Sequence, residues 1–364
     1  MNWTHTRRLR VDPNHPEPDL IATAAHAVRK GCLVAFPTET VYGLGANALD
    51  ADAIARIFAA KGRPATDPII AHIASLDQLR DLALDIPQLA IDLGKRLWPG
   101  PLTLVLKRHP RVPANLSAGR DTVAVRMPDH PVATALIQSA GTPIAAPSAN
   151  LFTHPSPTTA EHVLHDLNGR IELILDSGPT HIGVESTVLD LTGSVPTVLR
   201  PGGVPLETLR ELIPTVAVAH RILSADESAA SPGQLLKHYS PSAQVILFTG
   251  PVAPVLHRMR DTAQQLLAAG KAVGILTVDD ERDHFADLPA HLFPLGPLSD
   301  LPAIARHLFT GLRELDSRGV SVILVRDVGH EGLGLAIWDR LFRAAEGRVI
   351  DVGRNVLRPH GSIM

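Results

Sequence analysis

The fold of the first part of the chain is set by the stretch CLVAFPTETVYGLG, residues 32–45. Its apolar half, Cys32–Phe36, predicts a buried strand, and the polar loop Pro37–Gly45 follows where that strand ends. Apolar residues at helical spacing predict one helix before the strand, over Asp19–Lys30, and another after the loop, ending near Ala60. This alternation is typical of α/β folds, in which loops at strand ends commonly hold ligands.

Further short apolar runs predict that the first domain, residues 1–213, is built on one sheet. The expected strands are Ile69–Ile73, Leu102–Lys107, Thr122–Met127, Leu173–Leu175, Ser186–Leu191 and Thr197–Arg200. The expected helices lie near Pro87–Leu97, Pro131–Ser139 and Thr159–Leu167. Because the strands from Thr122 onward follow one another with few helices between them, the sheet is predicted to be mixed rather than purely parallel.

The pattern of the chain changes after Ile213. Residues 214–243 show little periodicity and predict a linker. From residue 244 to residue 364 strands and helices alternate, which predicts a smaller Rossmann-like domain with a parallel sheet. Its expected strands are Val245–Phe248, Ala272–Val278 and Val320–Val325, and its expected helices are Val255–Ala269, Leu301–Leu315 and Leu333–Ala345.

Composition and missing motifs exclude several classes of protein. A formal net charge of −3 over 364 residues argues against a broad electrostatic surface for nucleic acid. The single cysteine, Cys32, excludes an internal disulfide and a cysteine-rich zinc site, and its apolar neighbours indicate an inert thiol. The chain has no Walker A motif, no G-x-G-x-x-G after a strand and no G-x-S-x-G. Because it shows neither a signal peptide nor a membrane-spanning run, we expect a soluble, cytoplasmic protein.

A lysine and an arginine stand close together in Lys61-Gly62-Arg63-Pro64, after an apolar helical run. Only six of the 34 basic residues are lysines, so a lysine beside an arginine favours a chemical role. An ammonium and a guanidinium side by side suit a polyphosphate, although cations at a helix end also complement the helix dipole. We expect both side chains to be exposed, so that their removal leaves folding nearly unchanged.

Arg126 is a cation inside the otherwise apolar run Thr122–Met127, where a charge needs a partner. That partner is either a substrate carboxylate or an internal Asp or Glu. Further along, the small residues of Ala145–Asn150 would let the backbone approach a ligand closely, or would form an Asx or Ser turn.

Five short motifs together give the chain a specific signature. They are PTETVYGLG at residues 37–45, KGRP at 61–64, PSAN at 147–150, GVESTV at 183–188 and LRPGG at 199–203. In this order they resemble the YrdC-like family of threonylcarbamoyl-AMP synthases over nearly all of the first domain. The segments Ser231–Gly233 and Lys237–Pro241 look like the linker of the family's long, two-domain form. The resemblance implies a twisted mixed sheet with a central cavity, followed by a smaller Rossmann-like domain.

The resemblance also implies a nucleotidyltransferase reaction, in which L-threonine, bicarbonate or CO2, and ATP give threonylcarbamoyl-AMP and pyrophosphate. Mg2+ would accompany ATP, and no metal site made by the protein is expected. The product would pass to proteins that transfer the threonylcarbamoyl group to the adenosine next to the anticodon of tRNA. Whether the chain itself contacts tRNA is left open.

Carried over by position, the resemblance assigns two sets of site residues. Lys61 and Arg63 would be catalytic as well as ATP-binding. The expected ATP ligands are Lys61, Arg63, Thr122, Ser148, Asn150, Ser156 and Arg200. The residues expected to hold threonine or its carbamate are Thr38, His72, Arg126, Ala146 and Ser186.

Tyr239, one of only two tyrosines in the chain, lies near the end of the expected linker. We predict that the segment from about Thr215 to Pro241 folds over the cavity as a lid, with Tyr239 as a further ATP contact. Such a lid would slow loss of the labile adenylate, and ligands should slow proteolysis between Thr215 and Ser231. The alternative is a tyrosine that only packs at the domain interface.

Two other classes of function keep the same fold. An RNA-binding or regulatory module would need stacking platforms, but aromatic residues make up only 4% of the chain. A carbamoyltransferase-type maturation protein would be expected to carry Cys-rich zinc modules, which one cysteine cannot build. The enzyme hypothesis is therefore favoured.

Overall fold

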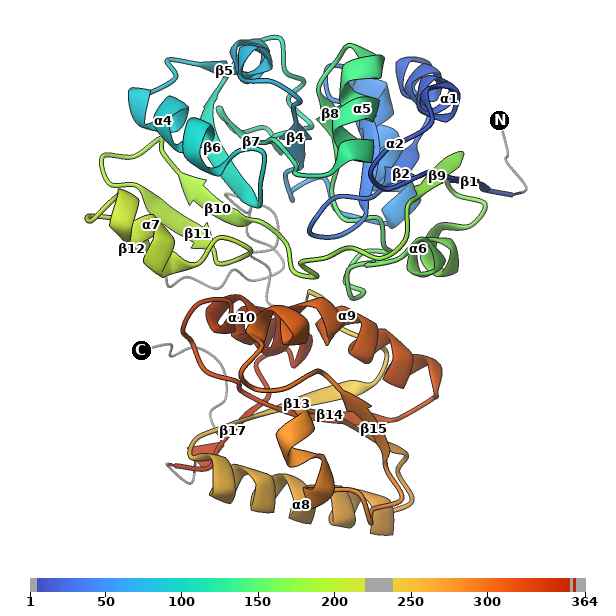
Figure 1. Ribbon diagram of the computed structural model, residues 1–364, viewed down its shortest axis with the longest axis vertical. Coiled ribbons are helices and arrows are strands. Elements are labelled where there is room, and N and C mark those ends of the chain that lie inside the picture. Colours follow the sequence, from blue (N-terminus) through green and yellow to red (C-terminus); the bar gives the residue numbers. More distant parts are fainter. Residues whose placement is uncertain (1–4, 220–237, 354–355, 358–364) are drawn as a thin grey trace. The chain divides into compact units, whose positions relative to one another are not determined.

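The computed structural model describes residues 5–219, 238–353 and 356–357, which form two compact units (Figure 1). Described residues up to 152 and from 156 to 219 belong to the first unit, and residues 153–155 and those from 238 onward belong to the second. The predicted linker motif around Ser231–Gly233, and most of the predicted lid, lie outside the described residues. No helix in the described part of the chain is long and apolar enough to cross a membrane.

The first unit is built on one mixed sheet, which confirms the predicted fold class. Its strands follow the order β1-β9-β2-β3-β8-β4-β7-β6-β10-β11-β12, and β5 pairs with β6 outside this path. Their bounds are β1 Arg7–Arg10, β2 Val34–Phe36, β3 Gly43–Asn47, β4 Ile70–His72, β5 Ala83–Leu84, β6 Leu102–Arg108, β7 Thr122–Arg126, β8 Ile144–Ala145, β9 Leu173–Asp176, β10 Thr187–Asp190, β11 Thr197–Arg200 and β12 Ala217–Val218.

Helices cover both faces of this sheet. They are α1 Pro18–Arg29, α2 Ala51–Lys61, α3 Leu79–Leu82, α4 Gln88–Leu97, α5 Pro131–Ala140, α6 Ala160–Leu167 and α7 Leu206–Leu212, with a 3-10 turn at Leu76–Gln78. Around β2 the side chains alternate: Val34 and Phe36 pack into the cluster that contains residues of α1 and α5. Leu33 and Ala35 pack into the cluster that contains residues of α2. Burial on both faces explains the continuous apolar run at the start of the quoted stretch.

The quoted stretch forms a β-hairpin, because the predicted loop ends in a strand. β2 and β3 are antiparallel, with Phe36 opposite Gly43 and Val34 opposite Gly45. A Cβ on Gly45 would lie 2.8 Å from the Phe36 ring and 3.0 Å from the Val34 carbonyl oxygen, so glycine is required there. The glycine-rich sequence hides this strand, since glycine is depleted in strands.

Helix α2 brings the first basic motif to the sheet. The Asp50 carboxylate caps the helix by accepting hydrogen bonds from the backbone N–H groups of Asp52 and Ala53, at 3.0 and 3.1 Å. At the other end Gly62 has a φ of 64°, which ends the helix directly after Lys61. The cap and the glycine together fix where the lysine side chain begins.

The first unit continues past the predicted boundary at Ile213. Ala217–Val218 form β12, which pairs in parallel with β11. Two residues are too short for a periodicity signal, so the strand is set by its partner rather than by its own sequence.

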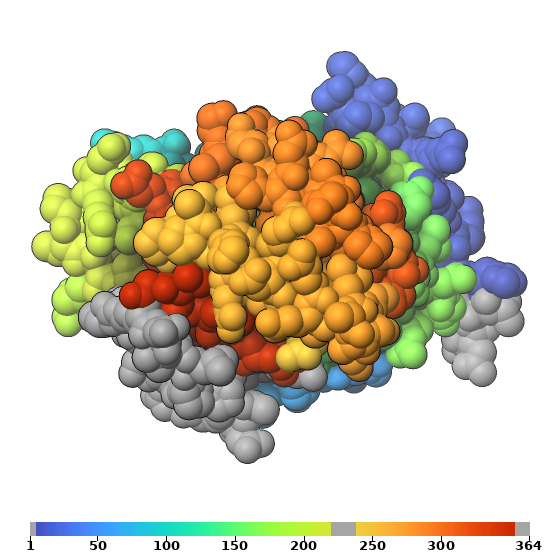
Figure 2. Space-filling model, turned by 90° about the horizontal axis from the view of Figure 1, so that it is seen from below, coloured from blue at the N-terminus to red at the C-terminus, as the bar shows by residue number. Residues whose placement is uncertain are grey.

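The second unit is a small α/β domain with an almost wholly parallel sheet, as predicted. Its strand order is β15-β14-β16-β13-β17-β18, and only the β17–β18 pair is antiparallel. The elements are β13 Gln244–Thr249, α8 Val252–Ala268, β14 Val273–Thr277, a 3-10 helix at Asp279–His284, β15 His291–Pro294, α9 Leu301–Ser317, β16 Val322–Arg326, α10 Gly334–Ala344, β17 Val349–Asp351 and β18 Val356–Leu357. Helices α9 and α10 cover one face of the sheet and α8 the other (Figure 1). Figure 2 shows the side of this unit on which α8, yellow to orange, forms the outer surface.

Candidate active site

The motif PSAN at residues 147–150 lies directly against the hairpin of the first motif. Gly43 forms an isolated β-bridge with Ser148, and the Leu44 N–H donates to the Pro147 carbonyl at 2.8 Å. The Ala149 N–H donates to the Tyr42 carbonyl at 2.8 Å. Backbone pairing therefore joins two motifs that are about a hundred residues apart in sequence.

Lys61 connects the KGRP motif to the same place. Its Nζ donates to the backbone carbonyls of Ser148 and Asn150, each at 2.5 Å. The Lys61 side chain is buried, with only 2% of the residue exposed. A buried ammonium bonded to two carbonyl groups holds the PSAN turn and places a positive charge beside it.

Arg63 is also buried, and its guanidinium forms an ion pair with Asp67. Its Nη2 lies 3.0 Å from the Asp67 Oδ2 and donates to the Pro68 carbonyl at 2.7 Å. The expectation that Lys61 and Arg63 are exposed was therefore wrong. The partners that bury Lys61 are distant in sequence, since they belong to the PSAN backbone, whereas those of Arg63 follow it within five residues. Removing either cation leaves buried partners unpaired, so it is expected to cost stability.

Asp67 forms an ion pair with Arg63 and is also influenced by two further cations. Burial raises the pKa of its carboxyl group, while attraction to Arg63, Lys61 and Arg200 opposes that rise. Three basic side chains from two separate motifs thus lie within electrostatic reach of one buried carboxylate. We did not single out Asp67 from the sequence, although its position four residues after Arg63 was an available signal.

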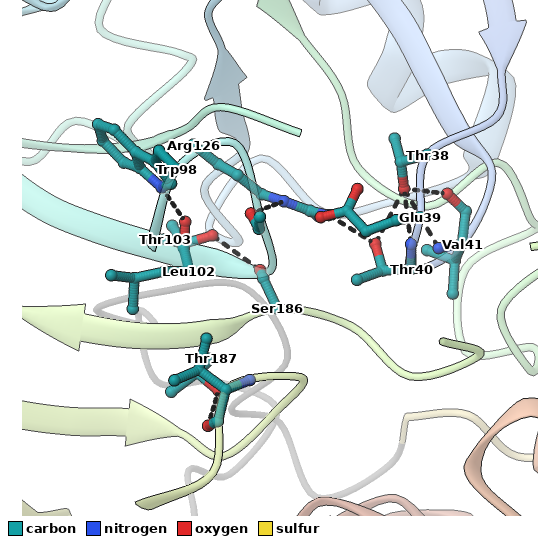
Figure 3. A network of polar contacts seen from close by, with 12 residues as sticks. Thr38, Glu39, Thr40, Val41, Trp98, Leu102, Thr103, Arg126, Ser186 and Thr187 are labelled. Carbon is teal, nitrogen blue, oxygen red and sulfur yellow. Dashed lines mark hydrogen bonds and ion pairs between the residues drawn. The ribbon is translucent and has the colours of Figure 1, made fainter. Parts of the chain in front are cut away.

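Arg200, at the end of β11, begins a series of contacts that crosses the sheet. Its Nη2 donates to the Ser186 carbonyl at 2.8 Å and to the Ser186 hydroxyl at 3.2 Å. The Ser186 and Thr103 hydroxyls are 2.7 Å apart (Figure 3). Thr103 stands opposite Arg126 in the β6–β7 register. The series therefore links a predicted ATP ligand to the residues predicted to hold threonine.

Arg126 has an internal carboxylate partner, which was one of the two alternatives. Its Nη2 lies 2.6 Å from the Glu39 Oε1 and donates to the Thr40 hydroxyl at 3.0 Å (Figure 3). Its Nε donates to the Gly100 carbonyl at 3.3 Å. All of these groups are buried, and a substrate carboxylate at Arg126 would join an ion pair that already exists.

His72 lies beside Arg126 in the β4–β7 register. Burial lowers the pKa of its imidazole from 6.5 to about 3, and the neighbouring Arg126 charge adds to the shift. The ring is therefore neutral at neutral pH. Its Nδ1 has no hydrogen-bond partner among the residues that the structure describes. A neutral, buried imidazole can offer a substrate one donor and one acceptor.

The remaining predicted threonine residues border the same loop. The Thr38 hydroxyl donates to the Val41 carbonyl at 2.6 Å and accepts from the Thr40 and Val41 N–H groups. Ala146 is buried, and its N–H donates to the Ile70 carbonyl of β4 at 2.9 Å. These contacts shape the backbone around the Arg126 pair.

The predicted ATP residues outside the cation group are placed differently. Ser156 is buried and donates its hydroxyl proton to the Glu185 carboxylate. Thr122 begins β7, four residues or about 13 Å along the strand from Arg126. The structure therefore separates Thr122 from Arg126, and its role at ATP stays a prediction.

Tyr239 belongs to the second unit and is buried there. Its ring centroid lies 5.3 Å from that of Phe309, in a tilted arrangement, and 4.0 Å from that of His238, in an edge-to-face arrangement. The Arg340 guanidinium lies over the ring, 5.2 Å from its centroid. Its φ of 61° is in the left-handed region, which is strained for a bulky residue. The predicted contact of Tyr239 with ATP stays a prediction.

No group of three or more His, Cys, Asp or Glu that could hold a metal ion occurs among the described residues. The acidic groups of the site are engaged with cations, Glu39 with Arg126 and Asp67 with Arg63. A magnesium ion would have to gain its ligands mainly from a bound nucleotide.

Comparisons with known proteins cover almost the whole chain. The family model described as "Telomere recombination", of the Sua5, YciO and YrdC type, matches residues 26–202. The model "Threonylcarbamoyl-AMP synthase, C-terminal domain" matches residues 204–346. The threonylcarbamoyl-AMP synthase of Pyrococcus abyssi is 49% identical, over 91% of this chain and 96% of the relative. That of Bacillus subtilis is 45% identical, over 95% and 99%.

A solved structure agrees with these sequence matches. The crystal structure of P. abyssi Sua5 complexed with L-threonine superposes with a TM-score of 0.89 at 47% identity. The match covers 95% of this chain and 99% of the other.

Proposed function

The chain belongs to the family of threonylcarbamoyl-AMP synthases, and we propose that it makes this adenylate from L-threonine, bicarbonate and ATP. One observation carries the assignment of the site. Basic residues of the KGRP and LRPGG motifs lie within electrostatic reach of Asp67, and hydrogen bonds lead from Arg200 through Ser186 to Thr103, the cross-strand neighbour of Arg126. A polyphosphate and an amino acid need such neighbouring cationic sites.

The proposed reaction needs no nucleophile from the protein. The threonine amine attacks the carbon of bicarbonate, giving a carbamate and water. A carbamate oxygen then attacks the α-phosphorus of ATP. The bond between this phosphorus and the oxygen that bridges to the β-phosphate breaks, and pyrophosphate leaves. The reaction makes the enzyme a nucleotidyltransferase. Catalysis comes from positioning and from fixed charges at the phosphates.

Lys61, Arg63 and Arg200 would stabilise the charge that develops on the transferring phosphoryl group and the leaving pyrophosphate. They are buried and held by hydrogen bonds to the protein backbone, so they need little reorganisation during the reaction. Mg2+ would arrive with ATP, bound by phosphate oxygens and water, and would neutralise part of the same charge.

Arg126 and its neighbours would hold threonine. The guanidinium suits the carboxylate of an amino acid, and neutral His72 adds a polar contact without adding charge. This division of the site assigns one end of the contact series to phosphate and the other to the amino acid.

The product would be handed to proteins that modify the adenosine next to the anticodon of tRNA, because a carbamic–phosphoric mixed anhydride is an activated group donor. That role favours a cytoplasmic location. Direct contact of this chain with tRNA is not part of the proposal.

Pyrophosphate exchange tests the proposed function. Labelled pyrophosphate should enter ATP only when threonine and bicarbonate are both present, since the adenylate forms only from the carbamate. Exchange that proceeds without either of them would contradict the proposal.

A further inference from the structure

Glu39 is a buried carboxylate that no step of the proposed reaction uses. Only 1% of the residue is exposed, and it lies in the loop between β2 and β3. Its Oε1 is 2.6 Å from the Arg126 Nη2, yet neither of its oxygens accepts a well-aligned hydrogen bond from a described residue. A carboxylate has room for about four such bonds.

The hydrogen bonds of the Arg126 guanidinium go to groups other than the Glu39 carboxylate. One N–H of the Arg126 Nη2 donates to the Thr40 hydroxyl at 3.0 Å (Figure 3). The Nε donates to the Gly100 carbonyl at 3.3 Å. The Glu39 carboxylate is thus paired with the guanidinium charge, but neither of its oxygens accepts a well-aligned hydrogen bond from a described residue. Leaving a buried carboxylate in this state is costly, so a ligand that brings N–H donors would be favoured here.

An α-amino acid carries an ammonium and a carboxylate on the same carbon atom. A site that recognises both must therefore present an anion and a cation side by side. The Arg126–Glu39 pair has this form. The contacts of Arg126 with the described residues use Nε and Nη2, which leaves Nη1 for a substrate carboxylate.

We propose that Glu39 binds the α-ammonium group of threonine, next to the carboxylate held by Arg126. This inference rests on the proposed function, and it adds a specificity residue: a ligand must bring both charges to satisfy both partners. After carboxylation the nitrogen keeps one N–H, which can still donate to Glu39.

His72 is the other polar group near Arg126, and it is less suited to an ammonium. It is neutral, and Arg126 beside it disfavours any further positive charge. Asp67 is a comparable buried carboxylate, but three cations already influence it. Glu39, which has one neighbouring cation and no well-aligned hydrogen bond from a described residue, therefore has capacity for a cationic ligand.

Three ligands separate the proposal from a purely supporting role for Glu39. L-Threonine carries both charges, L-threoninol lacks the carboxylate, and (R)-3-hydroxybutyrate lacks the amine. Binding of each to the full chain is measured by isothermal titration calorimetry. With Glu39→Gln, threonine and threoninol should bind about 10- to 100-fold more weakly, while 3-hydroxybutyrate is little affected.

Thr40→Val is the matched control, because it removes the hydrogen bond that orients Arg126 and keeps the Glu39 charge. It should weaken threonine and 3-hydroxybutyrate and leave threoninol nearly unchanged. Equal weakening of all three ligands by Glu39→Gln, or no weakening at all, would overturn the proposal. If Glu39→Gln does not fold, Glu39→Asp, which shortens the carboxylate's reach, must show the same pattern. Wild-type protein that fails to bind threonine would contradict the proposed function instead.

Discussion

His72 makes the stability of the first unit depend on pH in a way that can be worked out from its surroundings. Its pKa falls from 6.5 to about 3 on folding, chiefly through burial. The unfolded chain therefore binds a proton at this position below pH 6.5, whereas the folded chain does not until about pH 3. The stabilising contribution is complete above pH 6.5 and is lost as the pH falls toward 3.

The size of the effect follows from the shift. One pKa unit corresponds to about 1.4 kcal/mol, so at pH 5 the first unit should have lost about 2 kcal/mol through His72 alone. His72→Gln removes the titrating ring, so the variant should lose about 2 kcal/mol less between pH 7.5 and pH 5. The change in the free energy of unfolding between pH 7.5 and pH 5 is informative even if the variant is less stable than wild type at both values. Burial also lowers the pKa of His130, to about 4. This residue contributes equally to the pH dependence of stability in the wild type and in the variant.

Urea unfolding measured by fluorescence gives the required free energies. Trp98 is buried in the first unit, and replacing Trp3 and Trp338 by Phe makes it the sole reporter. His15→Gln, at an exposed imidazole, is the matched control for replacing a histidine by glutamine. An identical pH dependence in wild type and His72→Gln would refute the argument from burial.

Further substitutions test the two ends of the site. Lys61→Ala and Arg63→Ala should each reduce turnover by about two to three orders of magnitude, measured as pyrophosphate release. Because both side chains are buried, each substitution should also lower the melting temperature. Near-wild-type rates in either variant would contradict the assignment of these residues to catalysis. Arg126→Lys should raise the KM for threonine more than the KM for ATP, since lysine cannot reproduce a forked contact; a larger effect on ATP would reverse the division of the site. Asp67→Asn should cost about 3–5 kcal/mol of stability and enlarge the thermal stabilisation by ATP, which restores negative charge to the cations; unchanged melting would contradict the role of this ion pair.

The sequence was a good guide to elements whose signal is local. The buried strand in Cys32–Phe36 and the helix before Lys61 were predictable, because both follow from apolar spacing and helix ends. The strand Gly43–Asn47 was not, since its glycines are selected by close packing against β2 rather than by strand propensity. Short edge strands such as Ala217–Val218 depend on a partner strand.

Among the site residues, too, some could be predicted from local sequence and others could not. The cations could be named from motifs, because Lys and Arg are conspicuous among small and apolar residues. Their partners could not: the pairing of Glu39 with Arg126 joins residues far apart in sequence and follows from the strand order. The burial of Lys61 arises likewise from the PSAN backbone that accepts its hydrogen bonds.

The central claim is that one protein joins threonine, bicarbonate and ATP in a single adenylate. The most direct test incubates the full chain with 15N-threonine, 13C-bicarbonate and MgATP and analyses the products by mass spectrometry. The account predicts threonylcarbamoyl-AMP that carries both labels, in an amount equal to the pyrophosphate released. Pyrophosphate released without a doubly labelled adenylate would contradict it.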